Sequence, residues 1–148
     1  WSDSVERLSI GLIPLAAVGL IAPLGLLGFV PDTLGEDGDP LDALVILEEP
    51  TCPGCRVRAR PVGVFWMEDD AGPDAKIICV PYGDVRWDHV QDIDQLPDHL
   101  TDEIGHFFEV YKQLEPGKFA NTKGFEGREK AEAEIAESQQ RALGTTFA

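Results

Sequence analysis

Three short apolar runs separated by turns occupy residues 43–81 and restrict the folds open to the chain. The runs are ALVILEE (43–49), RVRARPVGVFWM (56–67) and KIICVP (76–81), and Gly, Pro and Asp recur in the turns between them. Runs of this length that are rich in β-branched and aromatic residues predict strands, and such short connections predict that successive strands pair. We therefore expect a small antiparallel barrel or sandwich.

The second of these runs begins with strict alternation. Arg56, Arg58 and Arg60 fall on one side of the predicted strand, and Val57 and Ala59 on the other. This period of two predicts a half-exposed strand with all three guanidinium groups on one solvated face.

The second half of the chain changes period. Apolar residues recur at three- and four-residue steps in 97–117, which predicts an amphipathic helix that ends at Pro116-Gly117. A second, more charged helix is expected over 128–143. The fold class is thus expected to be mainly β, with two C-terminal helices.

Composition limits the partners. The 148 residues predict one domain, and the formal net charge of -15 argues against a nucleic acid or an anionic membrane as partner and fits a protein that holds cations. The chain has 3 cysteines, too few for a disulfide scaffold, which favours a cytoplasmic location. Cys52 and Cys55 have the spacing of a redox or zinc motif, but their position in a turn between strands favours a plain turn.

The N-terminal residues differ from the rest. The stretch from Leu8 to Val30 carries no charge and is long enough to span a bilayer, but Pro14 and Pro23 interrupt it and disfavour a membrane helix. A membrane-tethered interaction protein is kept as one alternative. The change of composition near residue 27 predicts a leader over residues 1–27 that arose by frameshift or fusion, followed by a domain over 28–148.

Two acidic turns flank these strands, EDGDPLD (36–42) and EDDAGPD (68–74). Either one alone is typical of an exposed turn. A calcium EF-hand is excluded for the first, because Asp42 stands where that loop needs Gly and Pro40 breaks its middle. Two such turns on one small sheet can converge, and oxygen ligands in number favour Mg²⁺ or Mn²⁺ over zinc. Lys76 nearby is then a natural partner for phosphate.

A resemblance to a known family supports the hypothesis of a site for a divalent cation and phosphate. GFVPDTLGEDGDPLDALVI closely resembles the signature of the soluble (type I) inorganic pyrophosphatases, D-G-D-P-x-D followed by an apolar strand. The likeness continues in order through PGCRVRARPVGVFWMEDDAGPDAKIICVP, DHVQDIDQLP and HFFEVYKQLEPGK, and so covers roughly residues 28–143.

The resemblance implies an OB-like antiparallel β-barrel, in which the leader replaces the family's N-terminal strands, and hydrolysis of inorganic pyrophosphate to two phosphates with Mg²⁺. It implies that Asp39 is the general base. The metal ligands implied are Asp37, Asp42 and Asp74 for the first ion, and Asp69 with Asp74 for ions that arrive with the substrate. The phosphate ligands implied are Lys76, Tyr111 and Lys112. A homo-oligomer is also implied, hexameric as in bacterial members.

The chain departs from the family before residue 28. The family carries a Lys and an Arg in that region and a Tyr directly before Gly-Phe, where this chain has Leu27. An alternative is therefore a catalytically impaired domain that binds divalent metal or phosphate without turnover.

Overall fold

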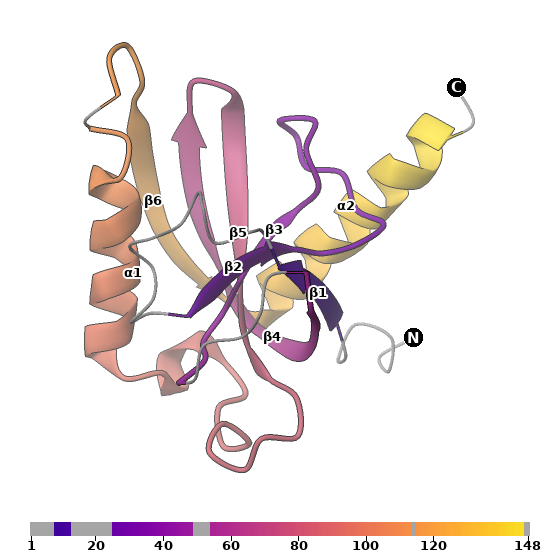
Figure 1. The fold of residues 1–148 in the computed structure, drawn as a ribbon, viewed down its shortest axis with the longest axis vertical. Helices are drawn as coiled ribbons and strands as arrows, with labels where there is room; N and C mark the ends of the chain where they lie inside the picture. Colours follow the sequence, from indigo (N-terminus) through magenta and orange to yellow (C-terminus); the bar gives the residue numbers. More distant parts are fainter. Residues whose placement is uncertain (1–7, 13–24, 49–53, 114, 147–148) are drawn as a thin grey trace.

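The computed structural model describes residues 8–12, 25–48, 54–113 and 115–146. In this part of the chain the strands form one 6-stranded sheet with two α-helices packed against it (Figure 1). The elements in chain order are β1 (Leu8–Leu12), β2 (Leu26–Phe29), β3 (Asp42–Val45), β4 (Arg56–Asp69), β5 (Gly72–Pro81), the 3₁₀ turn η2 (Ile93–Gln95), α1 (Asp98–Val110), β6 (Ala120–Gly127) and α2 (Arg128–Thr146).

The strand pairings give the sheet a barrel-like course. The order is β1-β2-β3-β5-β4-β6, and β1 also pairs with β4, so the pairings return to their starting strand while β6 extends the sheet beyond β4. The prediction of a mainly β, OB-like fold with two C-terminal helices is confirmed. The sheet is mixed rather than wholly antiparallel, because β3 and β5 run parallel.

That parallel pair positions the site. β4 and β5 form a long hairpin that leaves one edge of β5 for β3, so β3 pairs with β5 and not with β4, its neighbour along the chain. The parallel register sets Asp42 beside Lys76. A long-range pairing thus joins the two segments that carry the acidic turns.

β4 corrects the prediction of a half-exposed strand. Its residues from Ala59 to Phe65 are all buried, because the strand lies inside the sheet and is covered on both faces. Arg56 and Arg58 are exposed as predicted. Arg60 is not: it is only 7% exposed, and its Nη2 donates to the carbonyl oxygens of residues 87 and 90, at 3.0 and 2.8 Å.

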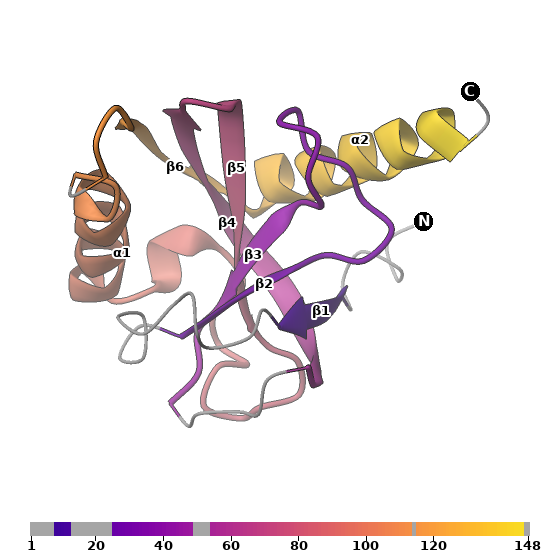
Figure 2. The same cartoon turned by 45° about the horizontal axis from the view of Figure 1, so that its top comes forward.

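The core has two parts, one under each helix. α2 contributes Ala131 and Ile135 to one cluster, and α1 contributes Ile104 and Phe108 to the other. Phe65 of β4 anchors the second cluster, with its ring centroid 5.5 Å from that of Phe108. The helices lie on either side of the long β4–β5 hairpin (Figures 1 and 2).

Both helices are confirmed with shifted ends, and three strands were missed: β1 and β2, which lie in or at the end of the predicted leader, and β6. α1 ends at Val110 rather than near residue 117, so Tyr111 and Lys112 follow the helix instead of lying within it. β6 has little apolar patterning, and its register against β4, with Phe125 opposite Phe65, is what makes it a strand.

Parts of the N-terminal prediction fall on residues 13–24, outside the described residues. Leu8–Leu12 pair with β2 and β4, and Leu27 lies within β2 opposite Leu44. Within the described ranges no helix is both long and apolar enough to cross a membrane. Cys52 also lies outside the described residues.

Gly63 of β4 offers a test of this packing. A Cβ there would lie 2.8 Å from the Cβ of Ile93 and 2.9 Å from the carbonyl oxygen of Glu126. We expect Gly63→Ala to lower the free energy of unfolding by about 1–3 kcal/mol, measured by urea denaturation, because neither neighbour can yield without moving backbone.

Gly105→Ala is the matched control. In α1 its added methyl would meet only Phe125, at 3.9 Å, and Ala favours a helix over Gly by up to about 1 kcal/mol. We expect this variant to be at least as stable as the wild type. Equal stabilities for the wild type and Gly63→Ala would contradict the close approach of η2 to β4.

Candidate active site

The first acidic turn projects Asp37 and Asp39 into solvent from the loop between β2 and β3. The amide of Gly35 donates to the carbonyl oxygen of Asp39 at 2.7 Å, and the amide of Asp39 donates to Asp37 Oδ1 at 3.1 Å. Gly38 takes a positive φ of 91°, which a residue with a side chain rarely adopts. Short hydrogen bonds and one glycine therefore shape the turn while both carboxylates stay exposed.

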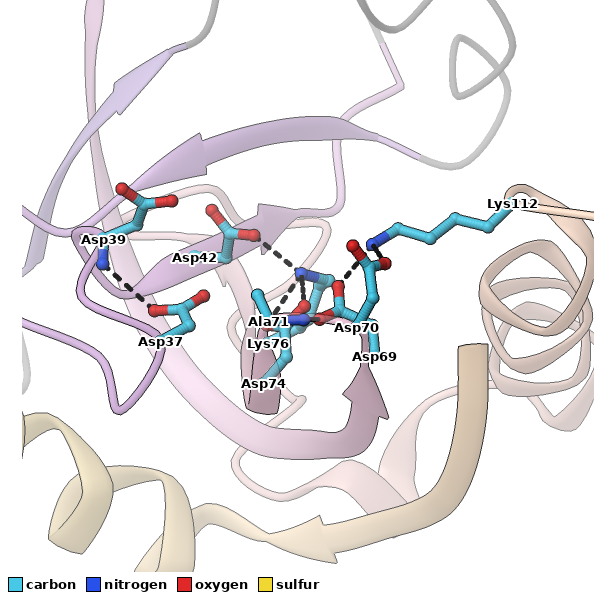
Figure 3. A network of polar contacts seen from close by, with 9 residues as sticks. All are labelled: Asp37, Asp39, Asp42, Asp69, Asp70, Ala71, Asp74, Lys76 and Lys112. Carbon is cyan, nitrogen blue, oxygen red and sulfur yellow. Dashed lines mark hydrogen bonds and ion pairs between the residues drawn. The ribbon is translucent and has the colours of Figure 1, made fainter. Parts of the chain in front are cut away.

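Lys76 joins the two acidic turns. Its Nζ donates to Asp42 Oδ2 at 2.6 Å and to Asp74 at 2.7 and 2.9 Å (Figure 3). Burial by itself would lower the pKa of the ammonium, but Asp42 and Asp74 outweigh it and raise the pKa above its ordinary value. Burial raises the pKa of Asp42, although Lys76 acts in the opposite direction.

Asp69 and Lys112 form a second ion pair at the far end of β4. Asp69 Oδ1 accepts from the amide of Ala71 at 2.8 Å, and Asp69 Oδ2 accepts from Lys112 Nζ, which also lies 3.4 Å from Asp70 Oδ1. Burial acts to raise the pKa of Asp69, but the hydrogen bonds from Lys112 and Ala71 prevail and lower it. This carboxylate is held ionised beside a lysine.

The phosphate ligands predicted from the sequence come from two elements. Lys76 lies on β5 with its Nζ 5.4 Å from the ring centroid of Phe108. Tyr111 and Lys112 follow α1, and Lys112 Nζ lies 5.5 Å from the centroid of the Tyr111 ring. Burial raises the pKa of Tyr111, so its hydroxyl stays protonated and can donate.

A pocket of about 100 Å³ gathers several predicted ligands. The predicted site residues in its wall are Asp37, Asp39, Asp42 and Asp74. Asp69 is not among the lining residues; it lies beyond Lys76, with Lys112 (Figure 3). Glu134 of α2 also lines the pocket and was not predicted, since a single acidic residue on a charged helix has no distinguishing pattern.

The chemistry of these donors fits a hard divalent cation. Carboxylate oxygens from both acidic turns face one pocket, and such oxygens are the ligands that Mg²⁺ and Ca²⁺ prefer. In the side-chain positions described, Asp42 and Asp74 are turned toward Lys76, and no group of three or more acidic, His or Cys side chains in the described part of the chain is close enough to enclose an ion.

The fold and the site define a class of protein: an OB-like barrel with an acidic pocket, two of whose carboxylates bond to Lys76, and this set of groups suits a divalent cation together with a phosphate group. Comparison identifies the family. A sequence model described as inorganic pyrophosphatase matches residues 21–143, and the chain belongs to the inorganic pyrophosphatase family, whose members are metal-dependent hydrolases.

Individual proteins named inorganic pyrophosphatase are similar to this chain in sequence and in structure. The chain is 57% identical to an inorganic pyrophosphatase of Streptomyces coelicolor over 114 residues, 77% of this chain and 70% of the relative. It is 53% identical to one of Leifsonia xyli over 105 residues, 71% of this chain and 64% of the relative. The crystal structure of the inorganic pyrophosphatase from Thermus thermophilus is similar with a TM-score of 0.78 and 46% identity, over 80% of this chain and 70% of that one.

Proposed function

We propose that residues 28–148 hydrolyse inorganic pyrophosphate to two phosphates with Mg²⁺. The observation that carries the proposal is the meeting of the two acidic turns, Asp42 from one and Asp74 from the other, on a single buried lysine. Membership of the family supports the same reaction.

The carboxylates divide the metal binding between them. Asp37, Asp42 and Asp74 would hold the first ion, and Asp69 with Asp74 would hold ions that arrive with pyrophosphate. When bound, Mg²⁺ lowers the pKa of a coordinated water and offsets charge on the phosphate oxygens. The exposed position of Asp37 supports this assignment, because an incoming ion meets this carboxylate without any prior opening of the core.

The remaining residues act on the proton and the leaving group. Asp39 takes the proton of the attacking water as the water oxygen bonds to one phosphorus. The bond from that phosphorus to the bridging oxygen breaks, and the second phosphate leaves with its charge offset by Lys76, Lys112 and the hydroxyl of Tyr111. The ammonium of Lys76 is kept charged by its surroundings, which supports this role.

Metal removal tests the proposal. With Mg²⁺ the chain is expected to release two phosphates per pyrophosphate, and excess EDTA is expected to abolish release until Mg²⁺ is restored, measured by a colorimetric phosphate assay. Stabilisation against heat by Mg²⁺ without any turnover would instead support the impaired domain that binds metal only.

We also propose a homo-oligomer, hexameric by resemblance to bacterial members, and a cytoplasmic location. The family supports the first of these and the low cysteine content the second.

A further inference from the structure

One face of α2 holds the loop that carries Asp37 and Asp39. The amide of Leu34 donates to the carbonyl oxygen of Ser138 at 3.0 Å, and the carbonyl oxygen of Leu34 accepts from Arg141 Nε at 2.8 Å. Both backbone polar groups of this one loop residue therefore bond to the helix. The loop runs beside α2 (Figure 2).

A buried polar cluster fixes the arginine that makes this contact. Arg141 Nη2 donates to Glu134 Oε1 and, at 2.7 Å, to Ser138 Oγ, while the Ser138 hydroxyl donates to Glu134 Oε1 at 3.1 Å. Ser138 is 0% exposed and Glu134 9% exposed. The guanidinium group is planar, so the bond from Nη2 to the Glu134 carboxylate also fixes the direction of the Nε–H bond, which points toward the carbonyl oxygen of Leu34.

The acidic turn is built directly on the anchored residue. Gly35 follows Leu34, its amide donates to the carbonyl oxygen of Asp39, and its own carbonyl oxygen accepts from Gly38 at 3.3 Å. Asp37 Oδ1 would lie 2.7 Å from a Cβ on Gly35, so this carboxylate sits against the same residue. The turn is therefore bonded to Gly35, and the residue before Gly35, Leu34, is bonded to α2.

The anchor opposes a repulsion that the proposed function requires. Carboxylates gathered for a cation repel one another until the cation binds, and an exposed turn can relieve that repulsion by moving away. We propose that Arg141, oriented by Glu134 and Ser138, is a positioning residue that holds the Asp37–Asp39 turn against the pocket and so preserves its affinity for Mg²⁺. The inference rests on the proposed function only for the identity of the ion.

Calorimetric titration of the full chain with Mg²⁺ tests it. Arg141→Gln is expected to raise the dissociation constant for Mg²⁺ about tenfold, the lower end of the usual effect of removing a group that orients metal ligands. The Mg²⁺ concentration for half-maximal hydrolysis should rise in step, while kcat at saturating Mg²⁺ and KM for pyrophosphate stay near wild type. A purely structural role would lower the melting temperature without moving the dissociation constant.

Three further variants complete the design. Arg141→Gln leaves the buried Glu134 without its charged partner, so Glu134→Gln/Arg141→Gln removes both charges together and is expected to show the same loss of affinity in a stably folded chain. Because Glu134 also lines the pocket, Glu134→Gln alone measures the effect of losing that carboxylate, and the double variant is expected to bind Mg²⁺ more weakly than this single variant. Glu137→Gln is the matched control, because Glu137 is exposed and lies 3.9 Å from the opposite side of the Arg141 guanidinium. It is expected to bind Mg²⁺ within about twofold of wild type, as a surface pair contributes little.

The outcomes separate the two proposals. Wild-type Mg²⁺ affinity in the folded double variant overturns the positioning role and leaves the hydrolase untouched. Absence of hydrolysis in the wild type overturns the proposed function, while the titrations still decide whether Arg141 controls the binding of Mg²⁺.

Discussion

Asp39→Asn is expected to lower kcat for pyrophosphate hydrolysis by about a hundredfold or more, the usual contribution of a general base. The amide has nearly the shape of the carboxylate but cannot accept the proton of the attacking water. The turn should survive, because the hydrogen bonds of Asp39 to Gly35 and Asp37 use its backbone and not its side chain. Steady-state phosphate release at saturating Mg²⁺ measures the effect.

Asp32→Asn is the control for this variant. Asp32 lies on the same loop, is exposed, and has a φ of 59° that Asn tolerates well. The same change of charge is made there outside the pocket, and kcat is expected to stay near wild type. If kcat for Asp39→Asn lay within threefold of that of the control, Asp39 would not be the general base.

Lys76→Met is expected to lower the free energy of unfolding by about 3 kcal/mol without Mg²⁺, because removing one partner of a buried ion pair leaves the other uncompensated. Lys76 is 3% exposed and is the shared partner of Asp42 and Asp74. With the lysine gone, these carboxylates repel each other and attract a divalent cation more strongly. Added Mg²⁺ should therefore stabilise Lys76→Met more than it stabilises the wild type.

Lys123→Met supplies the comparison. Lys123 pairs with Glu68 at 3.0 Å, but its side chain is 51% exposed, so the loss should stay below about 1 kcal/mol and be unaffected by Mg²⁺. Urea denaturation of the variants and the wild type, with and without Mg²⁺, gives all the values. Equal stabilisation of Lys76→Met and wild type by Mg²⁺ would show that Asp42 and Asp74 do not receive the ion.

Local pattern was enough for most elements of the fold. β-Branched runs between turns predicted β3, β4 and β5, and the three- and four-residue spacing predicted α1. The same reasoning was wrong about Arg60, because alternation says which residues share a face but not whether a later loop covers that face. It missed β1 and β2, because their uncharged stretch was interpreted as a leader, and it missed β6, which lies along β4 with almost no apolar pattern of its own.

For the site, too, the sequence predicted some features and missed others. The sequence indicated the acidic turns and, through its resemblance to a family, named Asp39 and its neighbours. It did not indicate that Lys76 bridges Asp42 and Asp74, that Lys112 pairs with Asp69, or that Arg141 of α2 donates a hydrogen bond to Leu34. Apart from the contact between Lys76 and Asp74, each of these contacts joins positions far apart along the chain.

By itself, therefore, the sequence determined β3, β4, β5 and both helices, the acidic character of the two turns and the family, since strand period, turn chemistry and motif spacing are properties of neighbouring residues. Only the tertiary structure decided that β3 runs parallel to β5, which brings Asp42 beside Lys76, and that Glu134, Ser138 and Arg141 support the first turn. The physical reason is that a strand edge and a charged side chain take whichever partner the packing of the whole chain brings within reach, and no local pattern encodes that choice.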